Sequence, residues 1–153
     1  MQVHYYKDEK LQENRVEVYF NKQDEEIKNL RAFLEDDKVL LGSKDKSTKR
    51  IFPTEIFYLE IVDRHCFAYL ESDVYQLEIS LRDFLEKYHT YGFVQIGKST
   101  IVNAKKIEHI VPDINMRMHL ILENEERLVV NRSYKKEFMA HLKGEGKDNE
   151  NHQ

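Results

Sequence analysis

The chain has a single cysteine, Cys66, among its 153 residues. One thiol excludes an intrachain disulfide and is typical of proteins from a reducing compartment. No stretch approaches the roughly 18 consecutive apolar residues of a membrane-spanning helix. The first ten residues, MQVHYYKDEK, also lack the basic-then-apolar order of a secretory signal. We therefore expect a cytoplasmic protein.

Glycine is scarce as well, with five residues in all, and no glycine-rich loop that could cradle a phosphate is present. The G-x-S-x-G pattern of a nucleophilic serine is also missing. The seven histidines show no close paired spacing, and Cys66 has no second cysteine beside it, so we expect no metal site. Cys66 lies in an apolar segment, which favours a core position over a reactive one. We expect no cofactor, no small-molecule substrate and no enzymatic activity.

The sequence does contain enough apolar material for a core, with 41% hydrophobic and 11% aromatic residues. A chain of this length is most simply one domain, or one domain with an appendage. Its net charge is −4, and the acidic excess lies outside residues 43–142, where 15 basic and 15 acidic residues balance. Because binding to nucleic acid depends on local charge, this total neither supports nor excludes it.

Residues 1–44 are predicted to form an N-terminal β-α-β segment with a regulatory or dimerisation role. Apolar residues alternate with others over 16–20, which predicts a half-buried strand. Acidic residues followed by apolar residues at helical spacing predict a helix over 24–34. A short apolar strand is expected at 39–41. The run SKDKSTKR at 43–50 has no apolar residue, which indicates a mobile hairpin tip or a linker.

The rest of the chain is predicted to be mainly β. Short apolar or alternating runs separated by polar turns predict strands at 56–62, 66–70, 74–77, 93–96, 107–111, 118–122 and 128–130. Ser80, with Asp83 three residues on, is typical of a helix N-terminus and predicts a short helix over 80–88. A second helix is expected from about Ser133, and the tail 143–153 is expected to be disordered.

The segment 92–107, GFVQIGKSTIVNAKKI, is the most informative part of the sequence. A short strand in it runs directly into Lys98, Ser99 and Thr100, and Asn103 follows a second apolar pair. Strand ends with cationic, hydroxyl and amide side chains can contact phosphate oxygens and base edges together. The segment therefore points to nucleic acid rather than to chemistry on a small substrate.

Five segments in this order resemble the LytTR-type DNA-binding domain of bacterial transcription regulators. They are IFYLEIVDRHCFAYL at 56–70, SLRDFLEKY at 80–88, the segment 92–107, MHLILENEERLVVNR at 118–132, and Ser133-Tyr134. The resemblance covers about residues 45–142. It implies a mainly β fold, α+β overall, of small antiparallel sheets with one short internal helix and a C-terminal helix.

In that family, loops at one edge of the sheets enter successive major grooves. By position, the resemblance implies DNA contacts from three loops, around Arg64 and His65, Lys98 and Ser99, and Asn131 and Arg132. Arginine can pair bidentately with guanine and asparagine with adenine, while lysine and serine reach phosphate. Gln95 and Gly97 stand where many members of the family have arginine and histidine, and Asn131 stands in place of the usual serine.

Each of these residues also has a plainer interpretation. Arg132 could form a surface ion pair with Glu126 or Glu137, and Lys98 could be merely solvated. His65 could be a half-buried turn residue, and Ser99 could cap the turn before the next strand. The basic pair Lys105 and Lys106 could reach phosphate or simply keep an exposed face soluble. For Asn103 we expect a structural role, since asparagine after a strand often bonds its own backbone.

The leading hypothesis is therefore a sequence-specific regulator that binds double-stranded DNA at two direct half-sites. The N-terminal segment is too short for a receiver domain and resembles that of free-standing LytTR regulators, for which a small membrane protein is the expected controller. A homodimer through the N-terminal segment and monomers that pair only on DNA are both open. The alternative is a protein-interaction or sensor domain that uses the N-terminal segment and binds no nucleic acid. RNA binding is a third option.

Overall fold

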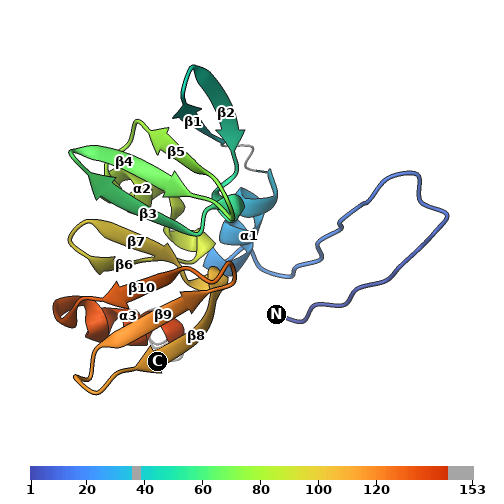
Figure 1. Ribbon diagram of the computed structural model, residues 1–153. Helices are drawn as coiled ribbons and strands as arrows, with labels where there is room; N and C mark the ends of the chain where they lie inside the picture. Colours follow the sequence, from blue (N-terminus) through green and yellow to red (C-terminus); the bar gives the residue numbers. More distant parts are fainter. Residues whose placement is uncertain (36–38, 145–153) are drawn as a thin grey trace. The chain divides into compact units, whose positions relative to one another are not determined.

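The computed structural model describes residues 1–35 and 39–144, and the predicted disorder of the tail therefore falls, over 145–153, outside the described residues (Figure 1). By its internal contacts the chain divides into two units, Met1–Asp36 and Asp37–Gln153. Among the described residues, the first unit contains one helix, and the second contains ten strands and two further α-helices.

The first unit contains the predicted helix, α1 (Glu25–Glu35). Its start is held by Asp24, whose Oδ1 accepts a hydrogen bond from the backbone N–H of Ile27 at 3.1 Å. Glu25 and Glu26 occupy the first turn, where carboxylates meet the positive end of the helix dipole. The strand predicted over 16–20 is wrong, because these residues form no regular secondary structure and belong to neither sheet of the described chain. An alternating pattern makes a strand only where a partner offers its backbone groups.

The second unit consists of two antiparallel sheets, which confirms the mainly β fold (Figure 1). The larger has the strand order β2-β1-β5-β4-β3-β7-β6. Its strands are β1 (Leu40–Lys44), β2 (Ser47–Ile51), β3 (Tyr58–Val62), β4 (His65–Tyr69), β5 (Val74–Leu77), β6 (Phe93–Gly97) and β7 (Thr100–Asn103). The smaller has the order β10-β9-β8 and consists of β8 (Ile107–Pro112), β9 (Met118–Leu122) and β10 (Arg127–Val130).

Helical segments connect these strands. The two α-helices of this unit are α2 (Leu81–Tyr88) and α3 (Lys135–Leu142), and the 3₁₀ turns are η1 (Pro53–Glu55), η2 (His89–Tyr91), η3 (Ala104–Lys106) and η4 (Arg132–Tyr134). The predicted N-cap of α2 is confirmed, since Ser80 Oγ accepts from the backbone N–H of Asp83 at 3.1 Å. The chain reverses after η2 at Gly92, whose φ of 95° lies in the left-handed region that glycine adopts without strain.

Two strands were not expected from the sequence. Residues 43–50 were predicted to be a hairpin tip or a linker; they do include the tip of the β1–β2 hairpin, but also most of its paired residues, since Leu40 pairs with Ile51 and Lys44 with Ser47. The predicted boundary between residues 44 and 45 falls in the turn of this hairpin. β2 is an edge strand with mostly polar, exposed residues, so it has no apolar alternation to reveal it. β7 is the other addition, and it pairs with both β3 and β6.

The core lies on both faces of the larger sheet, because successive side chains of a strand point to opposite sides. Leu59, Ile101 and Phe93 face α2, where the ring of Phe84 meets that of Phe93 edge-on at 4.7 Å. Tyr58 and Val102, next in sequence, face the smaller sheet and α3. This second cluster packs the two sheets together and fixes the ends of their strands relative to one another.

Two buried residues, one with an amide and one with a thiol, behave as predicted. Asn103 is buried, donates from Nδ2 to the carbonyl of Ile56 at 2.9 Å and accepts from the backbone N–H of Lys105 at 3.1 Å, which confirms its structural role. Cys66 is buried in β4, and burial raises the pKa of its thiol to about 11. A thiol that stays protonated at neutral pH is a poor nucleophile, as expected for a core position.

Gly42 gives a test of the junction between the hairpin and the rest of the sheet. A Cβ at this position would meet Cδ1 of Ile51 and lie 2.7 Å from Cβ of Tyr75, whereas a Cβ at Gly97 would meet no atom within 4 Å. We expect Gly42→Ala to lower the free energy of unfolding by about 1–3 kcal/mol through overpacking. The control, Gly97→Ala, should change it by less than about 0.5 kcal/mol. Equal urea denaturation curves for the two variants would contradict this packing.

Candidate nucleic-acid interface

Three connections lie side by side at one end of the strands, on the left of Figure 1. They are the β3–β4 turn at 63–64, the β6–β7 turn at 98–99, and residues 131–132 after β10. The backbone N–H of Ile61, near the end of β3, donates to the carbonyl of Ser99 at 2.9 Å, which ties the strand that leads into the first turn to the second turn. The N–H of Asn131 donates to the carbonyl of Ile96 at 2.8 Å, which joins the second to the third. The structure thus brings the three predicted loops together.

The β3–β4 turn has an unfavourable backbone at Arg64. Val62 and His65 close the turn as a pair, and between them Asp63 and Arg64 have φ of 50° and 68°. Two consecutive positive φ angles suit Asn-Gly or Asp-Gly, and Arg64 occupies the position where glycine is preferred. A non-glycine residue in this region costs roughly 1–2 kcal/mol. Such strain is typical of positions where function requires the side chain.

His65 is oriented by a residue of a neighbouring strand. Gln76 Nε2, on β5, lies 3.0 Å from His65 Nδ1. This contact with the side-chain amide of Gln76 orients the imidazole ring. His65 itself is exposed, so the interpretation as a half-buried turn residue is wrong. Nε2, the other ring nitrogen, takes no part in this contact.

The β6–β7 turn follows an irregularity in β6. Gln95 pairs with Ile101 and Gly97 with Thr100, so Ile96 is an extra residue, a β-bulge. Its carbonyl accepts from Asn131. Gln95 Nε2 donates to the carbonyl of Gly97 at 2.9 Å and so braces the strand just before the turn. Lys98 and Ser99 are exposed at the tip of the β6–β7 turn.

The third connection is built around Asn131. Its Oδ1 accepts from both the backbone N–H and the hydroxyl of Ser133 at 3.2 Å, which caps η4 and sets the direction of the chain. Arg132 is exposed immediately after it. Within the described residues Arg132 forms no ion pair with Glu126 or Glu137, so that plainer interpretation is not realised.

Arg64, Lys98 and Arg132 share an electrostatic property. None of the three forms an ion pair among residues 1–35 and 39–144, although other lysines of the same unit do. Lys44, for example, lies 2.8 Å from Asp73. Three cations at one edge of the molecule therefore have no partner of opposite charge within the described chain. Such an edge attracts a polyanion.

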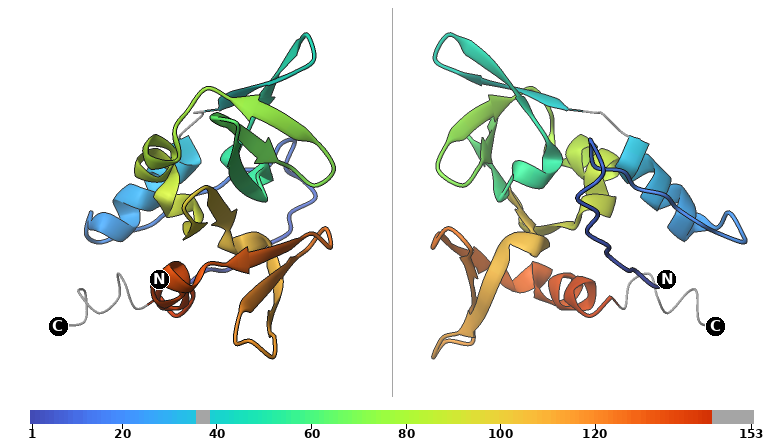
Figure 2. Two further views of the ribbon diagram at one scale, coloured as in Figure 1. Left: turned by 60° about the vertical axis from the view of Figure 1, so that its left-hand side comes forward. Right: turned by 90° about the vertical axis from the view of Figure 1, so that its right-hand side faces the viewer.

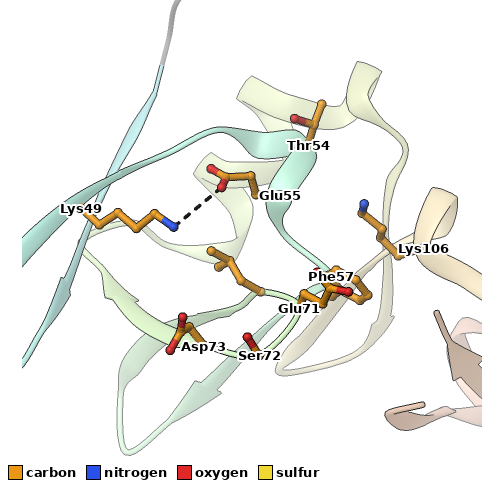
Figure 3. Close-up of a pocket in the computed structure, with 9 residues that line it drawn as sticks. Lys49, Thr54, Glu55, Phe57, Glu71, Ser72, Asp73 and Lys106 are labelled. Carbon is orange, nitrogen blue, oxygen red and sulfur yellow. Dashed lines mark ion pairs between the residues drawn. The ribbon is translucent and has the colours of Figure 1, made fainter. Parts of the chain in front are cut away.

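Lys105 and Lys106 lie elsewhere. They belong to η3, which begins where β7 ends, at the end of that strand opposite to the Lys98-Ser99 turn. The Nζ of Lys106 sits 5.0 Å from the centre of the Phe57 ring, and the residue lines a cavity of about 350 Å³ together with Lys49, Glu55 and others (Figure 3). The structure does not bring this basic pair to the three connections.

Gln76 and Ile96 support this site through their contacts with His65 and Asn131, and no feature of the sequence predicted either contact. Gln76 is eleven residues from His65 and meets it only through the pairing of β4 with β5.

In the described residues no group of His, Cys, Asp and Glu is arranged to hold a metal ion. The described helices are each too short or too polar to cross a membrane.

A family model of the LytTr DNA-binding domain matches residues 46–143. The chain belongs to the LytTR family. This LytTR domain resembles the solved LytTr DNA-binding domain of a protein described as a methyl-accepting/DNA response regulator from Bacillus cereus. The two share 25% sequence identity with a TM-score of 0.65, over 69% of this chain and 97% of the other. The family is a class of DNA-binding domain of regulators, not a class of enzyme.

Curated relatives match the same region. The sensory transduction protein LytT of Enterococcus faecalis is 29% identical over 60% of this chain, and the sensory transduction protein LytR of Streptococcus mutans is 33% identical over 58%. The matches span only 38% and 36% of the length of those two proteins. An uncharacterized HTH-type transcriptional regulator of Staphylococcus aureus is 23% identical over 85% of this chain and 90% of its own length.

Arg64 allows stability and binding to be separated. We expect Arg64→Gly to raise the free energy of unfolding by up to about 1 kcal/mol, because glycine adopts the positive φ without strain. The same variant should lose about 1–3 kcal/mol of DNA-binding free energy if the guanidinium contacts a base. Arg64→Asn, which also tolerates this conformation, is the matched control for loss of the cation. Thermal unfolding and fluorescence anisotropy measure the two effects, and a drop in stability for both variants would contradict the strained turn.

Proposed function

We propose that this LytTR protein is a sequence-specific transcription regulator that binds double-stranded DNA at direct repeats and inserts its three connections into successive major grooves. The observation that supports this most is the joined edge itself, where three exposed cations that form no ion pair within the described residues lie on neighbouring turns: Arg64, Lys98 and Arg132. Cations at fixed spacing can contact phosphates and base edges on one side of a duplex at the same time.

The chemistry of each side chain gives it a different role. Arg64 and Arg132 have planar guanidinium groups, which recognise the O6 and N7 atoms of guanine bidentately. Lys98 and Ser99 suit phosphate oxygens, as a point charge and a hydroxyl donor. The imidazole of His65, oriented by Gln76, can form a hydrogen bond to a base edge through its second ring nitrogen.

The backbone of the site is strained in one place and held by hydrogen bonds in others, and this supports sequence-specific binding over non-specific binding to DNA. Non-specific binding requires only positive charge near phosphates and tolerates mobile side chains. Here a left-handed Arg64, a bulge at Ile96 and a cap at Asn131 each fix the direction of one contact. Sequence reading requires such fixed directions, because hydrogen bonds to base edges are sensitive to angle.

Selection of duplexes from a random pool, followed by gel-shift titration, tests the proposal. We expect an enriched motif in two copies with the same orientation, about one helical turn apart. With about four to six phosphate contacts per bound chain, the slope of log affinity against log salt should be near −4 to −5. Affinity that is indifferent to both sequence and salt would refute the proposal.

Arg132 gives the sharpest single substitution. We expect Arg132→Ala to weaken binding to the selected site by about 1–3 kcal/mol and to relax the preference at one base pair. Lys98→Ala should instead weaken all sequences similarly and reduce the salt slope by about 1. The control is Arg82→Ala on α2, which removes an exposed arginine that lies 3.7 Å from Glu86. We call the three connections at 63–64, 98–99 and 131–132 the reading edge. If Arg82→Ala and Arg132→Ala weaken binding equally, these connections do not read the base sequence.

A further inference from the structure

The β8–β9 turn, residues 113–117, carries two large apolar side chains that stand in solvent. Ile114 is 98% exposed and Met116 is 77% exposed, more than any other large apolar side chain described in the second unit. One exposed apolar residue is ordinary on a protein surface. Two such residues in one five-residue turn form a local apolar tip, which is typical of a surface that binds a partner.

This turn is held in one conformation by Asp113. Its Oδ1 accepts from the backbone N–H groups of Asn115 and Arg117 at 2.8 and 2.9 Å, and its Oδ2 accepts from Arg117 Nε and His119 Nε2, both at 2.9 Å. The hydrogen bond from His119 first, and those from Arg117 and Asn115, hold the pKa of the Asp113 carboxyl well below its usual range. The carboxylate is therefore ionised at neutral pH and keeps the turn braced. Such a turn presents its side chains at a small cost in conformational entropy.

The turn lies at the same end of the smaller sheet as the reading edge. Met118, which follows the turn, pairs with Val130, and Arg132 comes two residues after Val130. Lys135, at the start of α3, donates from Nζ to the carbonyl of Met116 at 3.4 Å. Figure 1 shows the turn below the three connections, and both views of Figure 2 show the β8–β9 hairpin projecting beyond the rest of its unit.

We propose that Ile114 and Met116 form an apolar wedge that enters the groove beside the one read by Arg132, unstacks a base step and bends the duplex. The inference rests on the proposed function and extends it to DNA shape. Isoleucine and methionine are among the side chains that DNA-bending proteins insert between base pairs. Arg132 on the neighbouring connection would hold its base pair in the adjacent groove while the wedge enters. Two side chains offer far less than the roughly 800 Å² that each partner contributes to a stable protein interface.

The test compares the full chain with its Ile114→Ala/Met116→Ala variant on a duplex that contains one selected half-site and a fluorophore at each end. We expect the variant to bind about tenfold more weakly, which corresponds to the loss of a few buried methylene groups. Energy transfer between the ends should fall, because the bound duplex is straighter. The slope of log affinity against log salt should stay unchanged, because no phosphate contact is lost.

Two further variants make the result specific. Leu41→Ala removes an exposed apolar side chain from β1, where the residue is 62% exposed, and should leave both affinity and energy transfer unchanged. Ile114→Leu/Met116→Leu keeps an apolar tip and should retain most of the bend. Thermal unfolding of the double alanine variant should match that of the parent chain, since its two substituted side chains are exposed.

Three outcomes would overturn the wedge. The double alanine variant could bind and bend one half-site as the parent does. It could lose only cooperativity between two half-sites, which would assign the tip to a second copy of the chain. It could also weaken binding with an unchanged bend. If the parent chain enriches no sequence from a random pool, the proposed function itself fails, and this result is obtained before any variant is compared.

Discussion

Two backbone hydrogen bonds hold together the three connections that we propose as the reading edge. The bond from Ile61 to Ser99 ties the β3–β4 turn to the β6–β7 turn, and the bond from Asn131 to Ile96 ties β6 to the connection that carries Arg132. A DNA reader built from turns has no recognition helix to keep its side chains in register. Each turn left on its own would have to be ordered when DNA binds, at a cost in conformational entropy. Because of the two hydrogen bonds, the turns are already ordered in the folded protein, and this entropy is not lost again when DNA binds.

The bulge at Ile96 links this edge to the stability of the sheet. β6 is the last strand of the larger sheet and would expose a row of unpaired backbone groups. The bulge leaves Ile96 without a partner on β7, and its carbonyl accepts from Asn131 instead. The cap of η4 and the start of α3 then follow along this strand. The same contact therefore protects an edge strand and positions a candidate base-reading residue.

Local sequence patterns predicted most strands of the second unit, since their apolar faces are buried against α2 or the smaller sheet. They failed where structure depends on a distant partner. The pattern at 16–20 could not show that no strand lies beside it, and the polar β2 could not show that β1 pairs with it. For the site, family position located the three connections. Lys105 and Lys106 were grouped with Lys98 because they are near it in sequence, but β7 carries the chain across the sheet between them.

The net charge of −4 does not conflict with a DNA-binding edge, because DNA responds to the charge near it rather than to the total. Lys44 and Lys49 are paired with Asp73 and Glu55, away from the three connections. Such exposed ion pairs add little stability, but they neutralise positive charge on the part of the surface where they lie. The cations of the reading edge have no such partner within the described residues. The edge formed by the three connections is therefore the part of the described chain where we expect a duplex to be attracted.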